Sequence, residues 1–139
     1  MTTPHRLINP PELAAPAGFS HAVVAAPGRL VFVAGQVAQD AEGRIAGEAL
    51  EEQFDLAARN VVLALEAAGA RPEHVVSLQI FTTDVEGYRE RSREIGAAYR
   101  RHFGRHYPAM ALLGVPRLFD PEARIELVAT AVVPEAEAL

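Results

Sequence analysis

Residues 124–133 have the sequence RIELVATAVV, and the alternation in this stretch sets the architecture. Successive side chains of a β-strand point to opposite faces of a sheet. One face would be wholly apolar and suited to packing under helices, because it carries Ile125, Leu127, Ala129, Ala131 and Val133. The other face is mixed, with Val128 and Val132 beside Arg124, Glu126 and Thr130.

The rest of the sequence predicts five more strands and two helices. The strands are expected at about residues 5–8, 20–26, 29–37, 74–83 and 109–115. A helix at 48–68 has one apolar stripe, because apolar residues recur there at steps of three and four. A second helix, at about 85–103, begins after Asp84, a favourable capping residue.

This order, β-β-β-α-β-α-β-β, predicts an α+β fold with a single mixed sheet of about six strands and two helices on one face. We expect residues 1–139 to form one domain, with an irregular N-terminal segment at 1–17 and a frayed tail at 134–139. Two helices leave the second, partly apolar sheet face uncovered. We therefore expect another subunit to cover it, which predicts a homo-oligomer.

The composition excludes several kinds of chemistry. The chain has 139 residues and no cysteine, and all 13 of its basic residues are arginine. Disulfides, thiolate nucleophiles and lysine Schiff bases are therefore impossible. None of the serines lies in a Gly-x-Ser-x-Gly elbow, which argues against an esterase-type triad.

Charge and hydropathy bear on partners and location. The net charge of −5 disfavours nucleic acid as a partner. No apolar run is long enough to predict a membrane-spanning helix. The N-terminal MTTPHRLINP lacks the apolar core of a secretion signal, so we expect a soluble, cytoplasmic protein.

Six arginines and two histidines at 89–106 suggest two further interpretations. The arginines alternate with acidic residues as on a solvated helix and include no platform for stacking bases, so RNA binding is not expected. His102 and His106 have the i,i+4 spacing of a metal-binding pair. Gly104 lies between them and should end the helix, so we expect no metal site.

Five motifs in order resemble the Rid/YjgF family of reactive-intermediate deaminases, over about residues 15–133. They are LVFVAGQ at 30–36, NVVLALEAAG at 60–69, VVSLQIFTTD at 75–84, Tyr107-Pro108-Ala109 and Arg124-Ile125-Glu126. The resemblance implies a YjgF-like, chorismate-mutase-like fold and a homotrimer with ligand clefts between neighbouring subunits. It also implies hydrolysis of imines or enamines without a cofactor, which releases ammonia.

The resemblance assigns roles to individual residues. Glu126 matches the family's water-handling glutamate, and Gly35 matches a glycine whose backbone lines the cleft. His21 falls where many members have a tyrosine near the ligand, and Leu112 falls where a backbone N–H meets the ligand. Two alternatives stay open: Glu126 could be paired with Arg124 or with a neighbour's arginine, and His21 could be an ordinary interface residue.

The chain departs from the family pattern at Met110. An arginine that binds the substrate carboxylate normally follows the aromatic-Pro-Ala motif, and methionine provides only an apolar wall. The sequence does not reveal whether Arg105 replaces that arginine, and Arg117 belongs to an ordinary family turn. The second helix is also about one turn longer than in typical members, which would reshape the rim of the cleft.

These observations lead to three alternative functions. The first is a Rid-like hydrolase that detoxifies imine or enamine metabolites. In it, Glu126 would move the proton and backbone groups near Gly35 and Leu112 would hold the substrate. Met110 would alter the substrate specificity. The second is a non-catalytic trimer that binds a small metabolite or a protein partner. An endoribonuclease is a remote third, because some family members have been given that name.

Overall fold

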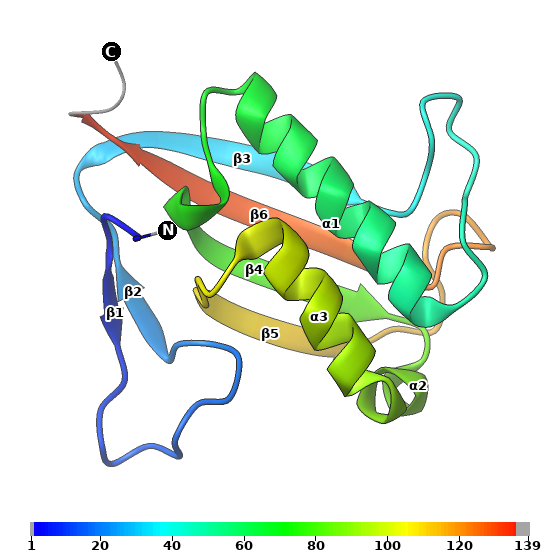
Figure 1. Cartoon of the computed structure of the whole chain (residues 1–139), viewed down its shortest axis with the longest axis horizontal. Coiled ribbons are helices and arrows are strands. Elements are labelled where there is room, and N and C mark those ends of the chain that lie inside the picture. The colour runs from blue at the N-terminus through cyan, green and yellow to red at the C-terminus, as the bar shows by residue number, and fades with distance from the viewer. Residues whose placement is uncertain (1, 136–139) are drawn as a thin grey trace.

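The computed structural model describes residues 2–135. They form two β-sheets and one layer of helices (Figure 1). The strands are β1 (Arg6–Ile8), β2 (Ala22–Val24), β3 (Gly28–Gln36), β4 (Val75–Thr82), β5 (Ala109–Gly114) and β6 (Ile125–Pro134). The helices are α1 (Leu50–Ala67), α2 (Val85–Glu90) and α3 (Ser92–Phe103), with the short 3-10 helix η1 (Pro72–His74) before β4. The predicted α+β fold is confirmed.

The larger sheet is mixed and has the strand order β3-β6-β4-β5. Strand β6 is antiparallel to both β3 and β4, whereas β4 and β5 are parallel. The six expected strands do not all join this sheet, because β1 and β2 pair only with each other. A single bridge between Ser20 and Ala109 connects that hairpin to β5. The connection between β1 and β2 contains Pro10, Pro11 and Pro16, which limit further pairing there because proline donates no backbone hydrogen bond.

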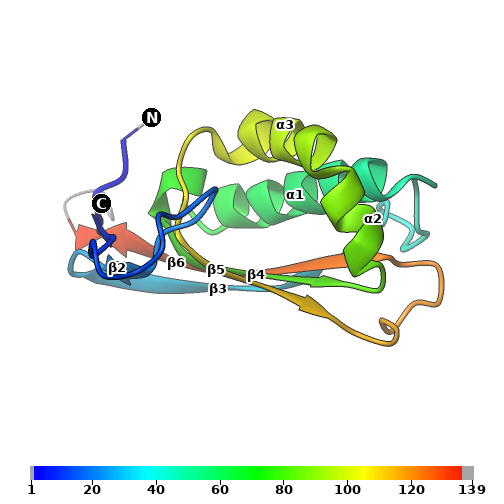
Figure 2. The same cartoon turned by 90° about the horizontal axis from the view of Figure 1, so that it is seen from below.

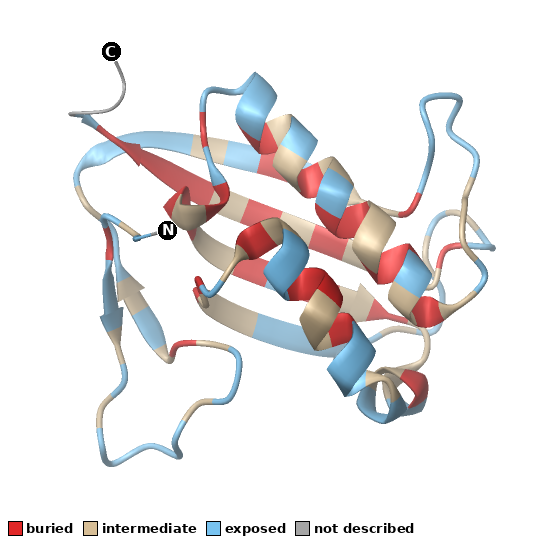
Figure 3. Ribbon diagram, in the orientation of Figure 1, coloured by how far each residue is buried: buried red, intermediate tan, exposed pale blue. Residues whose placement is uncertain are grey.

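The core lies between the larger sheet and α1. The β6 side chains Ile125, Leu127, Ala129 and Ala131 are almost completely buried, as the alternation predicted. The apolar stripe of α1 packs on them, and it comprises Leu50, Phe54, Ala57, Val61 and Leu65. Figure 3 shows this buried layer between sheet and helices, and Figure 2 shows that all helices lie on one side of the sheet. At about 25 cal/mol per Å², burial of these side chains is the main stabilising contribution.

Two residues mark the helix boundaries as expected. Gly69 follows α1 with φ of +80°, a conformation that favours glycine. The carboxylate of Asp84 accepts a 2.9 Å hydrogen bond from the Gly87 N–H and caps α2. The predicted second helix is interrupted at Arg91, where ψ is 24°, and therefore forms two helices, α2 and α3.

The sheet face opposite the helices is exposed and partly apolar. The side chains of Leu30 and Phe32 are 61% and 75% exposed on this face. No second helical layer covers it within residues 2–135 (Figure 2). In the same part of the chain, no helix combines the length and apolar character needed to cross a membrane.

The C-terminal end of β6 extends slightly further than expected. Pro134, placed at the start of a frayed tail by the sequence, is the last residue of β6, and the Glu135 N–H donates to the Pro27 carbonyl at 3.1 Å. Residues 136–139 of the predicted tail lie outside the described residues.

Buried histidines join the N-terminal hairpin to the main domain. His5 donates through Nε2 to the His74 carbonyl at 3.0 Å and accepts at Nδ1 from the Ala26 N–H at 3.0 Å. Nearby, His106 donates through Nε2 to the Val75 carbonyl at 2.7 Å, while its buried Nδ1 has no partner among residues 2–135. Burial lowers the pKa of His106 because the cation would be desolvated.

Acid should destabilise the fold through His106. Because the folded pKa is lowered, the unfolded chain takes up the proton first as the pH falls. The contribution of His106 to the free energy of unfolding is fully present above about pH 6.5. Below that pH it declines by at most ~1.4 kcal/mol per pH unit, because one proton is involved. Thermal melts at about pH 7.5 and about pH 5.5 should show a larger drop in Tm for the wild type than for His106→Gln. His21→Gln, away from this cluster, should keep the wild-type drop; equal drops in wild type and His106→Gln would contradict the assignment.

Candidate functional site

Glu126 lies against Gly35 on the helix-free face of the larger sheet. The pairing of β3 with β6 is regular up to Val33 opposite Ala129 and resumes at Gln36 opposite Leu127. The intervening residues of β3 form a bulge, a feature that re-aims neighbouring side chains. A Cβ placed on Gly35 would be only 2.8 Å from the carboxyl carbon of Glu126. Glycine is therefore required here if the carboxylate is to keep its position.

The carboxylate of Glu126 makes no hydrogen bond or ion pair within residues 2–135. Pairing with Arg124, one of the alternatives, does not occur. Instead, Arg124 forms a 2.8 Å ion pair with Asp84 and donates to the Glu48 carbonyl at 3.0 Å. Arg124 thus fixes the start of β6 and leaves the Glu126 carboxylate free to act on another molecule.

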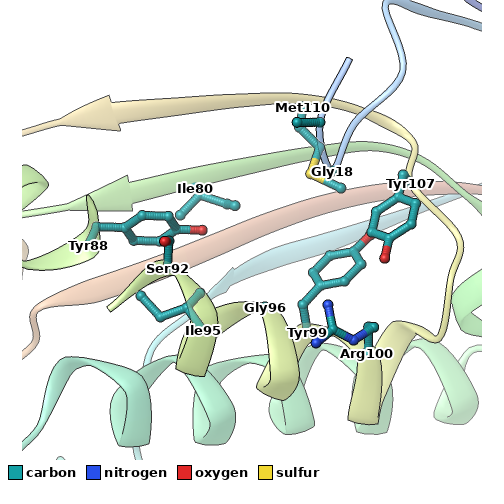
Figure 4. A pocket seen from close by; sticks show the side chains of 11 residues that line it. Gly18, Ile80, Tyr88, Ser92, Ile95, Gly96, Tyr99, Arg100, Tyr107 and Met110 are labelled. Atoms are coloured by element: carbon teal, nitrogen blue, oxygen red, sulfur yellow. The ribbon is translucent and has the colours of Figure 1, made fainter. Parts of the chain in front are cut away.

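Met110 lies on the opposite, helix-facing side of the sheet, on edge strand β5. It lines a hollow of about 370 Å³ between β5 and helices α2 and α3 (Figure 4). The walls are largely apolar and aromatic, with Ile80, Ile95 and Tyr107 among them. The hollow is at the lower end of the size range of small-molecule sites.

Leu112 lines a smaller hollow that adjoins the first. This second hollow measures about 310 Å³ and shares Gly18, Ile80, Tyr88 and Met110 with the larger one. Leu112 is 39% exposed there, on the strand that forms the edge of the sheet. Met110 therefore stands between an inner hollow near α3 and an outer hollow along β5.

His21 anchors the N-terminal segment beside the outer hollow. Its Nε2–H donates to the Ala14 carbonyl at 2.7 Å, and its backbone N–H donates to the Asn9 side chain at 2.8 Å. Its ring contacts Phe19 edge to face, with centroids 5.1 Å apart, and Phe19 lines the hollow. In this chain His21 contributes to the wall of the hollow through Phe19.

The five predicted site residues thus form two groups on opposite faces of the sheet, with His21 beside the second group through Phe19. Gly35 and Glu126 lie on β3 and β6 on the helix-free face. Met110 and Leu112 lie on β5, at the opposite edge of the strand order β3-β6-β4-β5 and on the helix-facing side. Figure 1 shows β3 and β5 at the two edges. One subunit therefore cannot bring the two groups to the same ligand.

The inner hollow contains polar residues that the sequence pattern did not single out. Tyr88, Ser92, Tyr99 and Arg100 project from α2 and α3 into it (Figure 4). Tyr88, Ser92 and Tyr99 recur at intervals of four and seven residues, which was the available signal, but their common target, β5, is distant in sequence. Burial raises the pKa of Tyr88 to about 12, so its hydroxyl stays protonated and can donate a hydrogen bond.

The remaining candidates lie elsewhere. Arg105 and Arg117 are exposed and line neither hollow. His102 bonds to Asp55 at 2.8 Å, whereas His106 points into the protein, so the two do not face a common site. No group of three or more potential metal-ligating side chains occurs within residues 2–135.

The fold and sequence match one family throughout. Residues 10–133 match the family model described as Endoribonuclease L-PSP. The crystal structure of YyfB, a Rid family protein from Yersinia pestis, superposes with a TM-score of 0.83 and 34% identity, covering 93% of this chain and 98% of that one.

Curated relatives agree with this assignment. A RutC family protein from Aquifex aeolicus is 32% identical over 127 residues, covering 89% of this chain and 98% of the relative. Protein HMF1 from Saccharomyces cerevisiae is 26% identical over 105 residues, or 76% of this chain and 77% of the relative. Because both the family model and the structural match extend over nearly the whole length, this chain belongs to the Rid/YjgF family.

Proposed function

We propose that the protein is a cofactor-independent hydrolase of reactive imines or enamines, with a site completed by two subunits. The observation that carries the proposal is the unpaired Glu126 carboxylate, held beside Gly35 at a bulge in an otherwise largely apolar sheet. A carboxylate that makes no ion pair within residues 2–135 is available for proton transfer to a bound molecule.

The chemistry needs little more than one such group. Water adds to the electrophilic imine carbon while Glu126 accepts one water proton, the C=N electrons move to nitrogen, and Glu126 returns that proton to the nitrogen to give a carbinolamine. Glu126 then accepts the carbinolamine hydroxyl proton and passes it to the amino group, so that the C=O bond forms as the C–N bond breaks and ammonia leaves. An enamine first becomes an imine by protonation on carbon. The products are ammonia and a carbonyl compound.

The arrangement of the two groups supports a ring of subunits. Gly35 and Glu126 near one sheet edge would meet Met110 and Leu112 of the next chain, which lie at the other edge. Contact between two different surfaces of the same chain is heterologous and closes into a ring when the rotation allows. The exposed Leu30 and Phe32 would be buried in such a ring. We infer a homotrimer with three equivalent clefts.

Met110 defines what the cleft accepts beside the reacting carbon. Its flexible apolar side chain favours an uncharged group where an α-carboxylate would need a cation. The preferred substrates would therefore be imines without an α-carboxylate. If the cleft only binds such molecules, the protein is a metabolite-binding trimer, the second candidate function.

Ammonia release from freshly generated imines tests the reaction directly. Two substrate sets, with and without an α-carboxylate, are compared with wild type, Glu126→Ala and Met110→Arg. Wild type should hydrolyse the uncharged set, and Glu126→Ala should be at least ~10²-fold slower, because general acid–base catalysis is lost. Met110→Arg should shift the preference toward α-carboxylates by about tenfold or more.

The other outcomes are also informative. No turnover by any of the three proteins would contradict the hydrolase and favour the binding function. RNA cleavage that is lost in Arg91→Glu/Arg101→Glu would favour the endoribonuclease. Both arginines are already paired with carboxylates, Arg91 with Glu51 and Arg101 with Asp55, which weakens that alternative.

Gly35→Ala tests the position of the carboxylate. The added methyl group would lie 2.8 Å from the Glu126 carboxyl carbon and must displace it. We expect kcat to fall about tenfold or more with a smaller change in KM, because substrate contacts with Met110 and Leu112 remain. Ala34→Ser, at the exposed neighbouring position of the bulge, should stay close to wild type. An unchanged kcat in Gly35→Ala would contradict the proposed role of Glu126.

Subunit complementation tests whether two chains share each site. Glu126→Ala and Met110→Trp damage different groups, and each variant alone should be inactive. Mixed trimers, co-expressed with different tags, should regain activity in about one quarter of the clefts, where both intact groups meet. Mixtures of Glu126→Ala with Gly35→Val affect the same group and should not recover. Failure of the first mixture, with mixed trimers confirmed by mass, would contradict the shared site.

A further inference from the structure

The inner hollow has an unusual concentration of tyrosine. The chain has three tyrosines and no tryptophan, and Tyr88, Tyr99 and Tyr107 all line this one hollow. The rings of Tyr99 and Tyr107 are stacked, with centroids 5.4 Å apart and planes 11° from parallel. The hydroxyl of Tyr99 is already used, because it donates to the His106 carbonyl. A rigid aromatic wall therefore stands behind Met110, at the end nearer the α3 C-terminus.

Arg100 stands beside this wall without a carboxylate partner. Arg89, Arg91 and Arg101, its neighbours on the same helical segment, form ion pairs with Glu86, Glu51 and Asp55. No carboxylate within residues 2–135 pairs with Arg100, which instead lines the hollow. A Cβ on Gly96 would be 3.4 Å from an Arg100 guanidinium nitrogen, so the side chain is folded back along α3. Figure 4 shows Arg100 at the end of the hollow that Tyr99 and Tyr107 also line.

Neutral donors complete the lining. Tyr88, whose pKa is raised to about 12 by burial, and Ser92 lie at the other end of the hollow (Figure 4). Among residues 2–135, no carboxylate lines the hollow. A guanidinium with no competing acid beside it suits a carboxylate, and the hydroxyls at the other end can donate to a polar group elsewhere on the same ligand. Ile80, Ile95 and Met110 lie along the apolar part of the wall.

We propose that Arg100 binds a carboxylate carried at the remote end of the ligand. The ligand's apolar body would pass Met110, and its other end would reach the outer hollow at Leu112. The substrate class is then an imine whose carboxylate is separated from the imine carbon by an apolar segment of several atoms. The assignment of this ligand as substrate rests on the proposed function, whereas carboxylate binding in the hollow does not.

Binding of 4-methylpentanoate, compared with the uncharged 4-methylpentanamide, tests this site without any turnover. Because all three tyrosines line the hollow, intrinsic tyrosine fluorescence reports occupation of this place. The acid should bind wild type and change the emission, and the amide should bind about tenfold more weakly. Arg100→Gln should weaken the acid about tenfold and leave the amide unchanged, since only a charge-assisted hydrogen bond is removed.

Two matched variants control for general loss of positive charge. Arg93→Gln removes an unpaired arginine from the same helix, and Arg105→Gln removes the arginine nearest the Tyr107 motif; neither residue lines the hollow. Both should bind the acid like wild type. Equal binding of acid and amide, equal binding by Arg100→Gln and wild type, or binding of the acid without a tyrosine response would overturn the proposal. Failure of ammonia release with intact, Arg100-dependent binding would instead count against the hydrolase alone.

Discussion

Burial of the helix-facing side of β6 under α1 is the interaction on which the other parts of the structure depend. Ile125, Leu127, Ala129 and Ala131 are almost completely buried there. Because β6 also pairs with β3 on one side and β4 on the other, these side chains fix the register of the whole larger sheet. A shift by one residue would move Glu126 into the core, so the same packing that stabilises the domain also determines which face carries the carboxylate.

The bulge in β3 determines what surrounds the Glu126 carboxylate. The bulge in β3 places Gly35 beneath Glu126, and the Arg124–Asp84 pair fixes the adjacent end of β6 without engaging Glu126. Asp84 also caps α2, the helix that carries Tyr88. One exposed ion pair thus links the end of β6 to a helix that forms the wall of the inner hollow. Because solvent screens this pair, its effect is mainly positional.

The two groups of predicted site residues lie on opposite faces of one sheet, with β4 between the strand of Glu126 and the strand of Met110, which makes assembly a condition of the proposed activity. The exposed apolar face and the separated groups support the same head-to-tail ring. In the proposed function, Met110 provides an apolar wall instead of a cation beside the reacting carbon, and Arg100 lines the inner hollow of the same subunit with Tyr99 and Tyr107. The charge preference of the family would be moved along the ligand instead of being lost.

The strands, α1 and the capping residue Asp84 could be predicted from the sequence, because alternation, helical periodicity and capping are local properties. The roles of Gly35 and Glu126 were predicted from motif resemblance and stay a prediction, and the structure places the two residues side by side. The break at Arg91, the separation of the β1–β2 hairpin and the lining of the inner hollow were not predictable in this way. Tyr88, Arg100 and Met110 meet only because α2 and α3 fold back over β5. Such contacts depend on packing between segments distant in sequence, for which no local pattern provides the geometry.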